Sequence, residues 1–456
     1  MPSLGSILSI ASSALRTQQR AINVVSHNIA NAETEGYSRQ LPQLSPWPPQ
    51  TTPNGVYGTG VRVVNVAQVR DSLLDRSYLR EVGQASSERA LHGVLAQTEA
   101  LLGNPSEGGI LESASAFFSA FSELATRPDN QSARSLLREA GRQLSSRFRE
   151  ASGGLSDLRA VTERRFVAGV DRINELSAEI ATLNGHIAAD ESHGATSGDL
   201  RDERRRLIDE LGTLVPVSVW DRSTGAVGVT TGGLSLVDGP NHTEVEVRTV
   251  GSTLGIGIVG RPGLLPEVGG TLGGFLEALN TELPSFQARL DDLAAAFVTE
   301  VNALHQSGTA PSGATGIDFF TGTSAWSMTL SADVEADLSN IAAGTALAGA
   351  YASGSNDIAL AVAQLRDVQD LGGLGLGFQD YHQETVTQLG LRVSSADANA
   401  RVHETLADNL DAQRLSVSGV STDEELVRLI QYQTGYQAAA RVVTAAQELL
   451  DTLVRM

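Results

Sequence analysis

The most constraining feature of this sequence is a narrow apolar stripe near its C-terminus. Residues 421–456 contain no proline, and their apolar side chains recur at alternating intervals of three and four. This spacing places them on one side of an α-helix, in the heptad arrangement typical of helices that pack along a partner. The stripe consists of Leu429, Tyr432, Tyr436, Ala439, Val443, Ala446, Leu450 and Leu453. Because one helix cannot bury such a stripe by itself, we expect this segment to pair with another helix.

The N-terminal stretch carries a matching stripe, with one polar member. It consists of Leu4, Leu8, Ala11, Leu15, Gln18, Ile22, Val25 and Ile29. Since each segment lies at one end of the chain, we predict that the two pair as an antiparallel coiled coil. An organellar presequence is the alternative for the Ser-rich, acid-poor N-terminus. It would leave the C-terminal stripe without a partner.

Composition excludes several classes of function. The 456 residues carry a net charge of −20, and no basic stripe could neutralise the phosphates of a nucleic acid. There is no cysteine, which excludes disulfides and thiolate chemistry, and all 33 basic residues are arginine, which excludes lysine chemistry. No apolar run is long enough to span a bilayer. No basic residue precedes Arg16, so we expect any export to use a route other than a cleaved secretory signal.

Changes in periodicity and in Pro, Gly, Val and Thr content divide the chain into regions. We expect a mainly α fold with a bundle of long helices and a small inserted antiparallel β domain, and a break in one long helix at Gly153-Gly154. The regions are a terminal coiled-coil domain (1–40 and 414–456), an extended proline-rich linker (41–68), a helical body (69–211 and 271–413) and an inserted β domain (212–270).

Signals of a chemical site are weak. Gly58 and Gly60 form a GxG without the third glycine of a dinucleotide fingerprint. His403 lacks the second histidine of a zinc-protease motif, and we expect it to be a stripe residue bonded to a neighbouring helix. His186 and His193 flank a Gly/Ser-containing loop and could bind a metal, but such pairs are common by chance. We therefore expect no catalytic, cofactor or metal site and predict that the protein is not an enzyme.

A charge-dense segment between residues 199 and 209 alternates carboxylates with arginines. Such alternation on a helix favours ion pairs between successive turns. We interpret this segment as a solvated, ion-paired helix face. Its members are Asp199, Arg201, Asp202, Glu203, Arg204, Arg205, Arg206 and Asp209.

Short motifs near both ends carry a family resemblance. The N-terminal motif comprises Asn28, Ile29, Ala30, Asn31, Thr34, Gly36 and Tyr37, and the C-terminal one comprises Tyr432-Gln433 and residues 436–442. Together they resemble the signatures shared by bacterial flagellar rod, hook and hook-associated proteins. Residues 416–425 resemble the hook-associated protein 1 branch of this family. The residues that carry this second resemblance are Ser418, Gly419, Val420, Asp423, Glu424 and Glu425.

Internal segments are similar to the same branch. They include residues 174–176, 180–184 and 199–204. Arg205 departs from the acidic residue that the family pattern leads us to expect, which puts a specific salt bridge at that position in doubt. The resemblance is weak across the β insert, and the chain is short for the family.

The resemblance implies a structural subunit that joins the flagellar hook to the filament. It implies terminal helices lining an inner tube, export through the flagellar type III apparatus from the cytoplasm, and an extracellular final location. The implied partners are further copies of the chain, the hook protein, the second junction protein and an export chaperone at the C-terminal helix. The stripe residues expected to form the assembly seam are Leu8, Leu15, Ile22, Val25, Ile29, Leu429, Tyr432, Tyr436, Val443, Leu450 and Leu453.

Other functions stay open at this point. A cytoplasmic coiled-coil scaffold would explain the stripes but not the end motifs. A secreted enzyme or glycan-binding adhesin could use the β insert. Within the flagellar family, the hook protein and the second junction protein are the alternatives.

Overall fold

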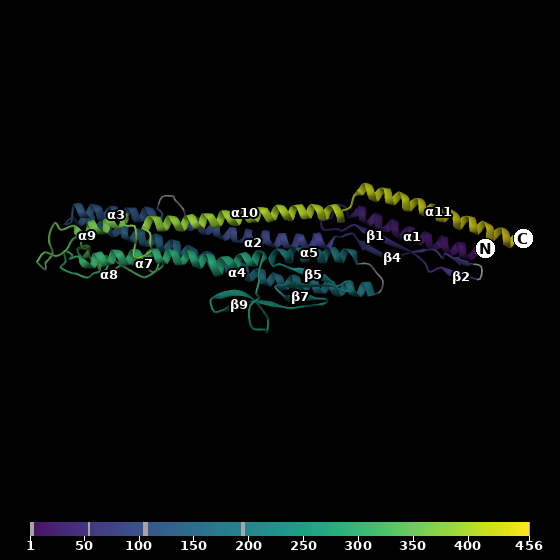
Figure 1. Ribbon diagram of the computed structural model, residues 1–456, viewed down its shortest axis with the longest axis horizontal. Coiled ribbons are helices and arrows are strands. Elements are labelled where there is room, and N and C mark those ends of the chain that lie inside the picture. Colours follow the sequence, from purple (N-terminus) through teal and green to yellow (C-terminus); the bar gives the residue numbers. More distant parts are fainter. Residues whose placement is uncertain (1–3, 53–54, 104–107, 193–196, 349, 456) are drawn as a thin grey trace.

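Long helices running along a common axis give the molecule the shape of a rod (Figure 1). The computed structural model describes residues 4–52, 55–103, 108–192, 197–348 and 350–455. These residues form a mainly α-helical fold with small antiparallel sheets, which confirms that part of the predicted fold class. Within these ranges, no helix combines the length and the apolar character needed to span a membrane.

The two terminal helices lie side by side at one end of the rod. They are α1 (Leu4–Ala30) and α11 (Thr422–Arg455), and both chain ends lie at the same tip (Figure 1). The helices are therefore antiparallel, as pairing of the two stripes requires.

Residues 41–68, where we expect an extended linker, form paired strands that pack on α1. Strand β1 (Gln40–Pro46) pairs antiparallel with β4 (Val61–Gln68), and β2 (Gln50–Thr52) pairs with β3 (Gly55–Tyr57). Proline is tolerated within β1 because each strand of a two-stranded sheet is an edge strand. We call α1, α11 and these four strands the terminal unit.

The rest of the rod is the helical body. Its longest elements are α2 (Ser72–Leu102), α4 (Gln131–Ser192) and α10 (Phe378–Ser418). The shorter elements are α3 (Ile110–Thr126), α5 (Gly198–Leu214), α6 (Gly270–Glu277), α7 (Leu283–Ser307), β11 (Phe320–Thr321), β12 (Thr329–Leu330), α8 (Ala332–Ala336) and α9 (Asp357–Gln364). A π-helical turn, Ala278–Glu282, joins α6 to α7.

Aromatic side chains fill the core at the far end of the body. Phe117 and Phe121 are fully buried, with ring centroids 5.0 Å apart, and Phe117 also lies 5.4 Å from Phe297. Edge-on contacts dominate this cluster, the geometry that the aromatic quadrupole favours. The aromatic residues of α3 therefore anchor α7 and the loop that carries β11.

The predicted break at Gly153-Gly154 is wrong, because α4 continues through both glycines. A β-carbon at Gly154 would lie 2.8 Å from the side chain of Leu101, and one at Gly153 would lie 3.2 Å from Trp326. The missing side chains let α2 and the 322–328 loop approach the helix. These glycines allow close packing of neighbouring elements and do not interrupt the helix.

The β insert lies between α5 and α6. It contains a four-stranded antiparallel sheet in the order β5-β6-β7-β8 and a β9–β10 hairpin. The strands are β5 (Ser218–Asp221), β6 (Val227–Thr231), β7 (Leu234–Asp238), β8 (Asn241–His242), β9 (Val245–Val250) and β10 (Thr253–Ile258).

Two buried or half-buried asparagines on α4 attach the insert to the body. Asn174 donates to the carbonyl of Val245 (2.8 Å) and accepts from its amide (2.9 Å). Asn184 accepts from the amide of Val227 (3.0 Å) and donates to the carbonyl of Gly239 (2.8 Å). Each asparagine side chain thus bonds one backbone N–H group and one backbone carbonyl of the insert.

Candidate assembly site between the terminal unit and the body

The predicted stripe residues of α1 and α11 are mostly half-buried along the helix pair. Leu8, Leu15, Ile22 and Ile29 are half-buried, whereas Val25 is buried. On α11, Leu429, Tyr432 and Val443 are half-buried. Tyr436 and Leu450 remain 37% and 36% exposed, and the side chain of Leu453 lies outside the described residues. The assignment of these residues to an assembly seam stays a prediction.

The polar member of the N-terminal stripe lies against a glycine of the opposite helix. A β-carbon on Gly435 of α11 would lie 2.8 Å from the side-chain nitrogen of Gln18. Gly435 therefore provides the space that the longer Gln18 side chain occupies. Pairing of a large with a small side chain keeps the two helix backbones close at this level.

Asn28, from the N-terminal family motif, is the centre of a fully bonded polar cluster. Its side chain is buried, and its amide nitrogen donates to the carbonyl of Gln40 (2.8 Å) and to Glu425 Oε2 (2.9 Å). Its amide oxygen accepts from the Tyr37 hydroxyl (2.9 Å) and the Gln40 amide (3.0 Å). Every donor and acceptor of this amide is therefore satisfied.

Glu425 joins the start of α11 to the end of α1. Glu425 is completely buried, and its carboxylate oxygen Oε1 accepts a hydrogen bond from Arg428 (3.2 Å). An ionised carboxylate without partners would be very costly at such a position. The bonds from Asn28 and Arg428 therefore explain why this acidic residue is tolerated where the two motifs meet.

The remaining N-terminal motif residues form the turn that ends α1. Asn31 donates from its side chain to the carbonyl of His27 (3.0 Å), and the Thr34 hydroxyl donates to Asn31 (3.3 Å). Gly36 has a φ of 77°, a conformation that glycine adopts without steric cost. A side chain there would also press on Arg206, which lies 3.1 Å from the β-carbon position.

The 416–425 motif forms the connection from α10 to α11. The carbonyl of Ser418 accepts from the backbone amide of Arg39 (2.8 Å), and the Arg39 guanidinium pairs with Glu424 (2.9 Å). Gly419 packs so closely on the carbonyl of Leu415 that a β-carbon would clash with it. Val420 is half-buried, and Asp423 is exposed in the first turn of α11.

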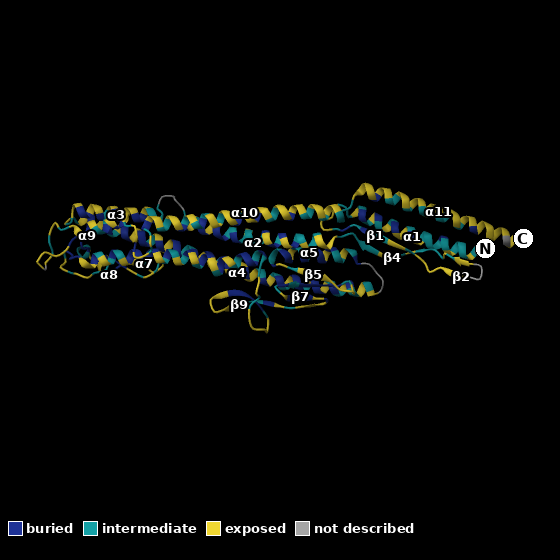
Figure 2. Cartoon of the chain, viewed as in Figure 1, coloured by how far each residue is buried: buried dark blue, intermediate teal, exposed yellow. Residues whose placement is uncertain are grey.

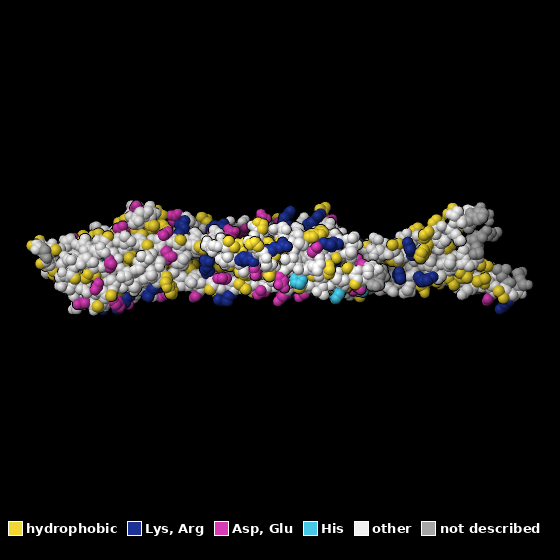
Figure 3. Space-filling model, turned by 90° about the horizontal axis from the view of Figure 1, so that it is seen from below, with side chains coloured by type: hydrophobic (Ala, Val, Ile, Leu, Met, Phe, Trp, Pro, Cys, Tyr) yellow, Lys and Arg dark blue, Asp and Glu magenta, His cyan; other side chains and the backbone are white. Residues whose placement is uncertain are grey.

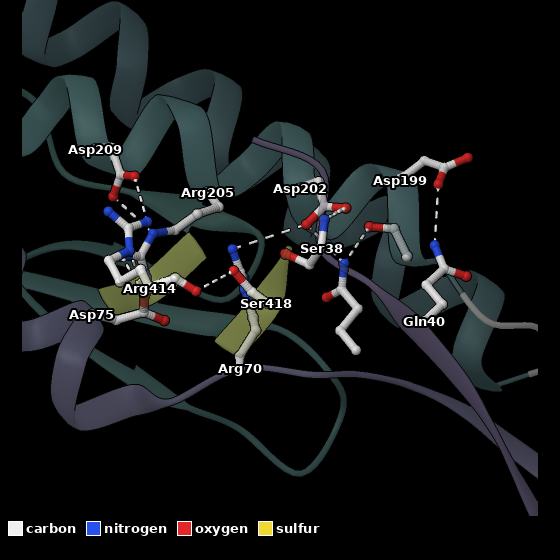
Figure 4. A network of polar contacts seen from close by, with 12 residues as sticks. Ser38, Gln40, Arg70, Asp75, Asp199, Asp202, Arg205, Asp209, Arg414 and Ser418 are labelled. Carbon is white, nitrogen blue, oxygen red and sulfur yellow. Dashed lines mark hydrogen bonds and ion pairs between the residues drawn. The ribbon is translucent and has the colours of Figure 1, made fainter. Parts of the chain in front are cut away.

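Helix α5 of the body holds the base of the terminal unit through Asp202. Asp202 accepts from the backbone amide of Ser38 (3.1 Å) and from Gln68 (2.8 Å), and the Arg70 guanidinium lies 3.9 Å away (Figure 4). Burial raises the pKa of Asp202, and the hydrogen bonds only partly oppose that rise. Gln40 reaches the same helix by donating to Asp199 (3.3 Å).

A second cluster beside Asp202 ties α5 to α2 and α10. Arg205 pairs with Asp75 (2.9 Å) and Asp209 (2.7 Å), and Arg414 pairs with the same two carboxylates, each at 3.0 Å (Figure 4). Arg414 also stacks on Tyr78, with 4.1 Å between the guanidinium carbon and the ring centroid. Arg205, which stands where the family pattern leads us to expect an acidic residue, thus forms ion pairs with two carboxylates.

The interpretation of 199–209 as a solvated face is partly wrong. Most of its residues are ion-paired, but Asp202, Arg204 and Arg205 are buried, because the strands and α2 cover this side of α5. Arg204 donates to Asn184 (2.8 Å) and to the carbonyl of Gly225 (3.0 Å). Charge alternation alone does not show which turns of a helix will be covered.

The histidine predictions have different outcomes. His403 contacts Glu81 of α2, with 2.8 Å between Nδ1 and the carboxylate, which confirms the expectation of a bonded stripe residue. Burial opposes ionisation of Glu81, but the bonds from His403 and Arg80 outweigh it and lower the pKa. His186 is exposed, and His193 lies outside the described residues. Among the residues placed by the structure, no group of three or more candidate ligands could hold a metal ion.

Sequence reasoning missed several residues of this junction, including Gln40, Gln68, Asp75 and Arg414. Their partners lie far away along the chain, so no local spacing could reveal them. The sequence offered one indication, which is that these residues lie near segments rich in charged or motif residues.

Three family models match separate parts of the sequence. The model of the flagellar hook-associated protein FlgK helical domain matches residues 95–320. The model of the flagellar basal body rod FlgEFG protein C-terminal region matches residues 411–456, and that of the flagella basal body rod protein matches residues 8–37. The matches thus include both terminal helices and much of the body.

Curated relatives extend the similarity over the full length. Flagellar hook-associated protein 1 of Bacillus subtilis (strain 168) is 28% identical, covering 98% of this chain and 97% of the relative. Its counterpart from Salmonella typhimurium is 25% identical over 557 aligned positions, covering 99% of this chain and 100% of the relative. Because this alignment is longer than the 456-residue chain, the Salmonella protein has segments that this chain lacks.

A solved structure shares the fold. The flagellar hook junction protein FlgK from Burkholderia pseudomallei aligns with a TM-score of 0.64 and 16% identity, covering 76% of this chain and 100% of that one. This likeness concerns the fold alone. The full-length relatives, the family models and the motif residues that meet around Asn28 show that the chain belongs to the flagellar hook-associated protein 1 (FlgK) family.

Proposed function

We propose that this protein joins the flagellar hook to the filament by assembling with copies of itself into an axial tube. Membership of the family makes it a structural component of the bacterial flagellum that assembles with other axial proteins. In the proposal, α1 and α11 pair as an antiparallel coiled coil that lines the tube. The observation that carries it is an apolar face on α11 that α1 does not cover.

This outer face of α11 is a second apolar stripe. Its larger members are Val427, Ile430, Val442 and Leu449, which are 56%, 62%, 45% and 57% exposed. Exposed Thr434, Ala438 and Ala445 complete steps of three and four between them. Burying a fully exposed Val, Ile or Leu side chain contributes roughly 1.5–3 kcal/mol, and covering the exposed part of each larger side chain would contribute a share of that. A helix with apolar stripes on two sides suits a position between two neighbours.

Exposed residues continue along the rod on α10 (Figure 2), and several of them are apolar, so a neighbouring copy could cover both helices. Leu391, Val402, Leu406 and Leu415 are 45–67% exposed. On the face seen in Figure 3, charged side chains crowd the middle of the rod, whereas the terminal unit carries mostly apolar or uncharged ones. This distribution supports lateral packing through the terminal unit.

The proposed domain division has four regions. Residues 1–40 and 414–456 form the inner tube, 41–68 connect it, 69–211 and 271–413 form the helical body, and 212–270 form an inserted β domain. The proposed neighbours are the hook protein and the second junction protein, with an export chaperone at α11 before assembly. The final location is extracellular, after export from the cytoplasm.

Substitution of Ile430 by aspartate tests the outer face of α11. Because Ile430 is 62% exposed, a charge there leaves the isolated chain folded but opposes burial against a neighbour. We expect Ile430→Asp to abolish filament formation in a complementation assay, with unchanged circular dichroism of the purified protein. Leu136→Asp, at an α4 residue that is 63% exposed, is the matched control and should restore filaments. Normal filaments with Ile430→Asp would contradict the proposal.

Deleting the gene distinguishes the junction role from the alternatives within the family. A junction subunit predicts intact hooks without filaments and flagellin shed into the medium. Loss of the hooks themselves would instead identify a hook protein. A chain that stays in the cell in the wild type would favour the cytoplasmic scaffold.

A further inference from the structure

A groove runs between α1 and the strands of the terminal unit. In this unit α11 lies on one side of α1 and the strands lie on the other (Figure 1). Successive turns of α1 between residues 9 and 20 form one wall of the groove, and residues 47–48 and 59–63 form the other. Its volume is about 650 Å³. The groove therefore faces away from the helix pair.

Hydrogen bonds between α1 and β4 fix the shape of this groove. The Thr17 hydroxyl donates to the carbonyl of Val61 (3.1 Å), and the amide of Val61 donates to the Ser13 hydroxyl (3.2 Å). Gly60 packs so closely on Ser13 that a side chain there would collide with it. The amide of Trp47 donates to the carbonyl of Gly60 (2.9 Å). The two walls are thus held together by the fold of the terminal unit.

Three arginines and no acidic residue line the groove. Arg62 stacks on Trp47, with 4.6 Å between the guanidinium carbon and the ring centroid. Arg16 donates to the hydroxyl (3.2 Å) and the carbonyl (3.4 Å) of Ser12, both uncharged groups. Among the residues that the structure describes, no carboxylate lies within 4.0 Å of Arg16, Arg20 or Arg62. The lining therefore carries positive charge without a counter-charge.

The sequence around the groove adds no counter-charge either. Residues 1–32 and 36–70 contain no Asp or Glu, although the whole chain has a net charge of −20. The groove is a basic site in an acidic protein, so charge complementarity selects an acidic occupant.

The turn that follows α1 carries the two acidic residues of the first 70. Glu33, Thr34 and Glu35 are exposed, and the hydrogen bonds at the end of α1 fix the shape of the turn. In the described part of the chain, no basic side chain lies within 4.0 Å of either carboxylate. Arg39 and Arg206, which are close to the turn, are already paired with other carboxylates. The turn is thus a rigid acidic projection without a partner of its own.

We propose that the groove of one copy receives the 33–35 turn of a second copy, with Glu33 and Glu35 facing Arg16 and Arg20. The proposal rests on the self-assembly proposed above and adds an axial contact to it. About 15 Å of helix separates Arg20 from the end of α1, so the turn meets a groove only on a copy displaced along the rod. A ring needs contacts between neighbouring sides, whereas a tube that extends along its axis also needs contacts between successive levels. The outer face of α11 supplies the first kind, and the groove and turn supply the second.

Exchanging the charges tests this contact in a complementation assay for filaments. Arg16→Glu combined with Arg20→Glu should reduce the number of filament-bearing cells at least about tenfold, because like charges then face one another. Glu33→Arg combined with Glu35→Arg should have the same effect, and all four substitutions together should restore filaments. Each of these residues is exposed, so the circular dichroism of the purified chains should be unchanged. Normal filaments with either pair alone, or no recovery with all four, would overturn the proposal.

A matched control separates this contact from an effect of net charge. Glu163 and Asp171 are exposed on α4, and within the described residues neither has a basic side chain within 4.0 Å. Adding Glu163→Arg and Asp171→Arg to the Arg16→Glu/Arg20→Glu chain restores its net charge but should not restore filaments. Recovery with this combination would overturn the proposal.

An introduced disulfide reports the contact directly, because the chain has no cysteine. Gln19 lines the groove, Thr34 lies between the two glutamates, and both are exposed. Oxidation of isolated flagella that carry Gln19→Cys together with Thr34→Cys should give covalent dimers, and each single variant should give none. A bond within one chain is excluded, because the Cα atoms of a disulfide lie within about 7 Å of each other. Absence of dimers from the double variant, or equal dimers from a single variant, would overturn the proposal.

These outcomes are separate from those that test the proposed function. If the Ile430→Asp and gene-deletion results hold but the charge exchange and the disulfide fail, the axial contact is wrong and the junction role stands.

Discussion

Asn28 shows how one side chain can define the connection between two distant motifs. Its amide bonds Tyr37 and Gln40, which follow α1, and Glu425, which begins α11. No apolar contact could specify this arrangement as narrowly, because hydrogen bonds depend on direction as well as distance. The cluster therefore fixes the start of α11 relative to the end of α1, and this effect depends on every member being hydrogen-bonded.

Replacing Asn28 by alanine should destabilise the terminal helix pair by about 2–3 kcal/mol, because Glu425 and Gln40 lose their buried partners. Native-state hydrogen exchange of amides in α1 and α11 measures the change. Asn23→Ala is the control, since Asn23 is exposed on the same helix and, among the residues that the structure describes, its side chain bonds only Gln19. Surface changes of that kind are usually within about 0.5 kcal/mol. Equal effects of the two substitutions would show that the cluster has no special role.

One buried and one half-buried histidine predict a loss of stability in mild acid. His305 contacts the carbonyl of Ile317 (2.7 Å) and accepts from the amide of Ala342 (3.0 Å), so the neutral ring fits both partners. Burial lowers the pKa of His305 and of His382 below the usual 6.5. The unfolded chain therefore binds more protons as the pH falls below 6.5, and the free energy of unfolding decreases.

Urea unfolding followed between pH 7.5 and about 5 measures this loss. Stability should be highest above pH 6.5 and fall as the pH approaches the lowered pKa values. His382→Gln should reduce the slope, whereas exposed His242→Gln should leave it unchanged. A flat profile across this range in the unmodified chain would contradict the prediction.

At the scale of elements, periodicity predicted the helices well and predicted poorly what covers them. The three-four spacing identified α1 and α11 to within a residue or two, because it reflects helix geometry directly. Pairing of β1 with β4 was missed, since the prolines of β1 indicated a linker. The burial of Asp202 and Arg204 was also missed, because the strands and loops that cover them come from other parts of the chain.

Alanine substitution at two glycines of α4 should change the stability of the protein in opposite directions. A β-carbon at Gly185 would have only Pro240 nearby, at 3.9 Å, so Gly185→Ala should stabilise the protein by about 0.5–1 kcal/mol through helix propensity. At Gly169 it would collide with the fully buried side chain of Leu272, so Gly169→Ala should destabilise by about 1 kcal/mol. Thermal unfolding compares the two variants. An equal gain from both would mean that the α4–α6 contact is looser than the structure shows.

At the scale of the whole molecule, the terminal unit and the body have separate apolar cores. The continuous core of the body extends from Leu79 to Ala396 and includes side chains of the β insert. The buried apolar side chains of α1 and α11 lie outside that core and are mostly small. The contact between the two parts is largely polar. The heptad stripes predicted the terminal pair, but nothing in the sequence indicated that the insert would share the core of the body.

This division predicts stepwise unfolding of the unassembled chain. Because its core is small and one face of α11 is exposed, the terminal unit should unfold at a lower urea concentration than the body. Amides of α1 and α11 should then exchange before those of α4 and α7. A single transition with uniform protection would show that the polar junction couples the two cores fully.

Two stretches of backbone cross from the terminal unit to the body, one after β4 and one between α10 and α11. The segment around Arg39 is bonded to both, through the amide of Val69 and the carbonyl of Ser418, each at 2.8 Å. If only one backbone connection joined the two parts, one part could rotate freely relative to the other. Two backbone connections that both hydrogen-bond to Arg39 resist twisting. In a rotating shaft, such a joint would pass torque from one part of the subunit to the other.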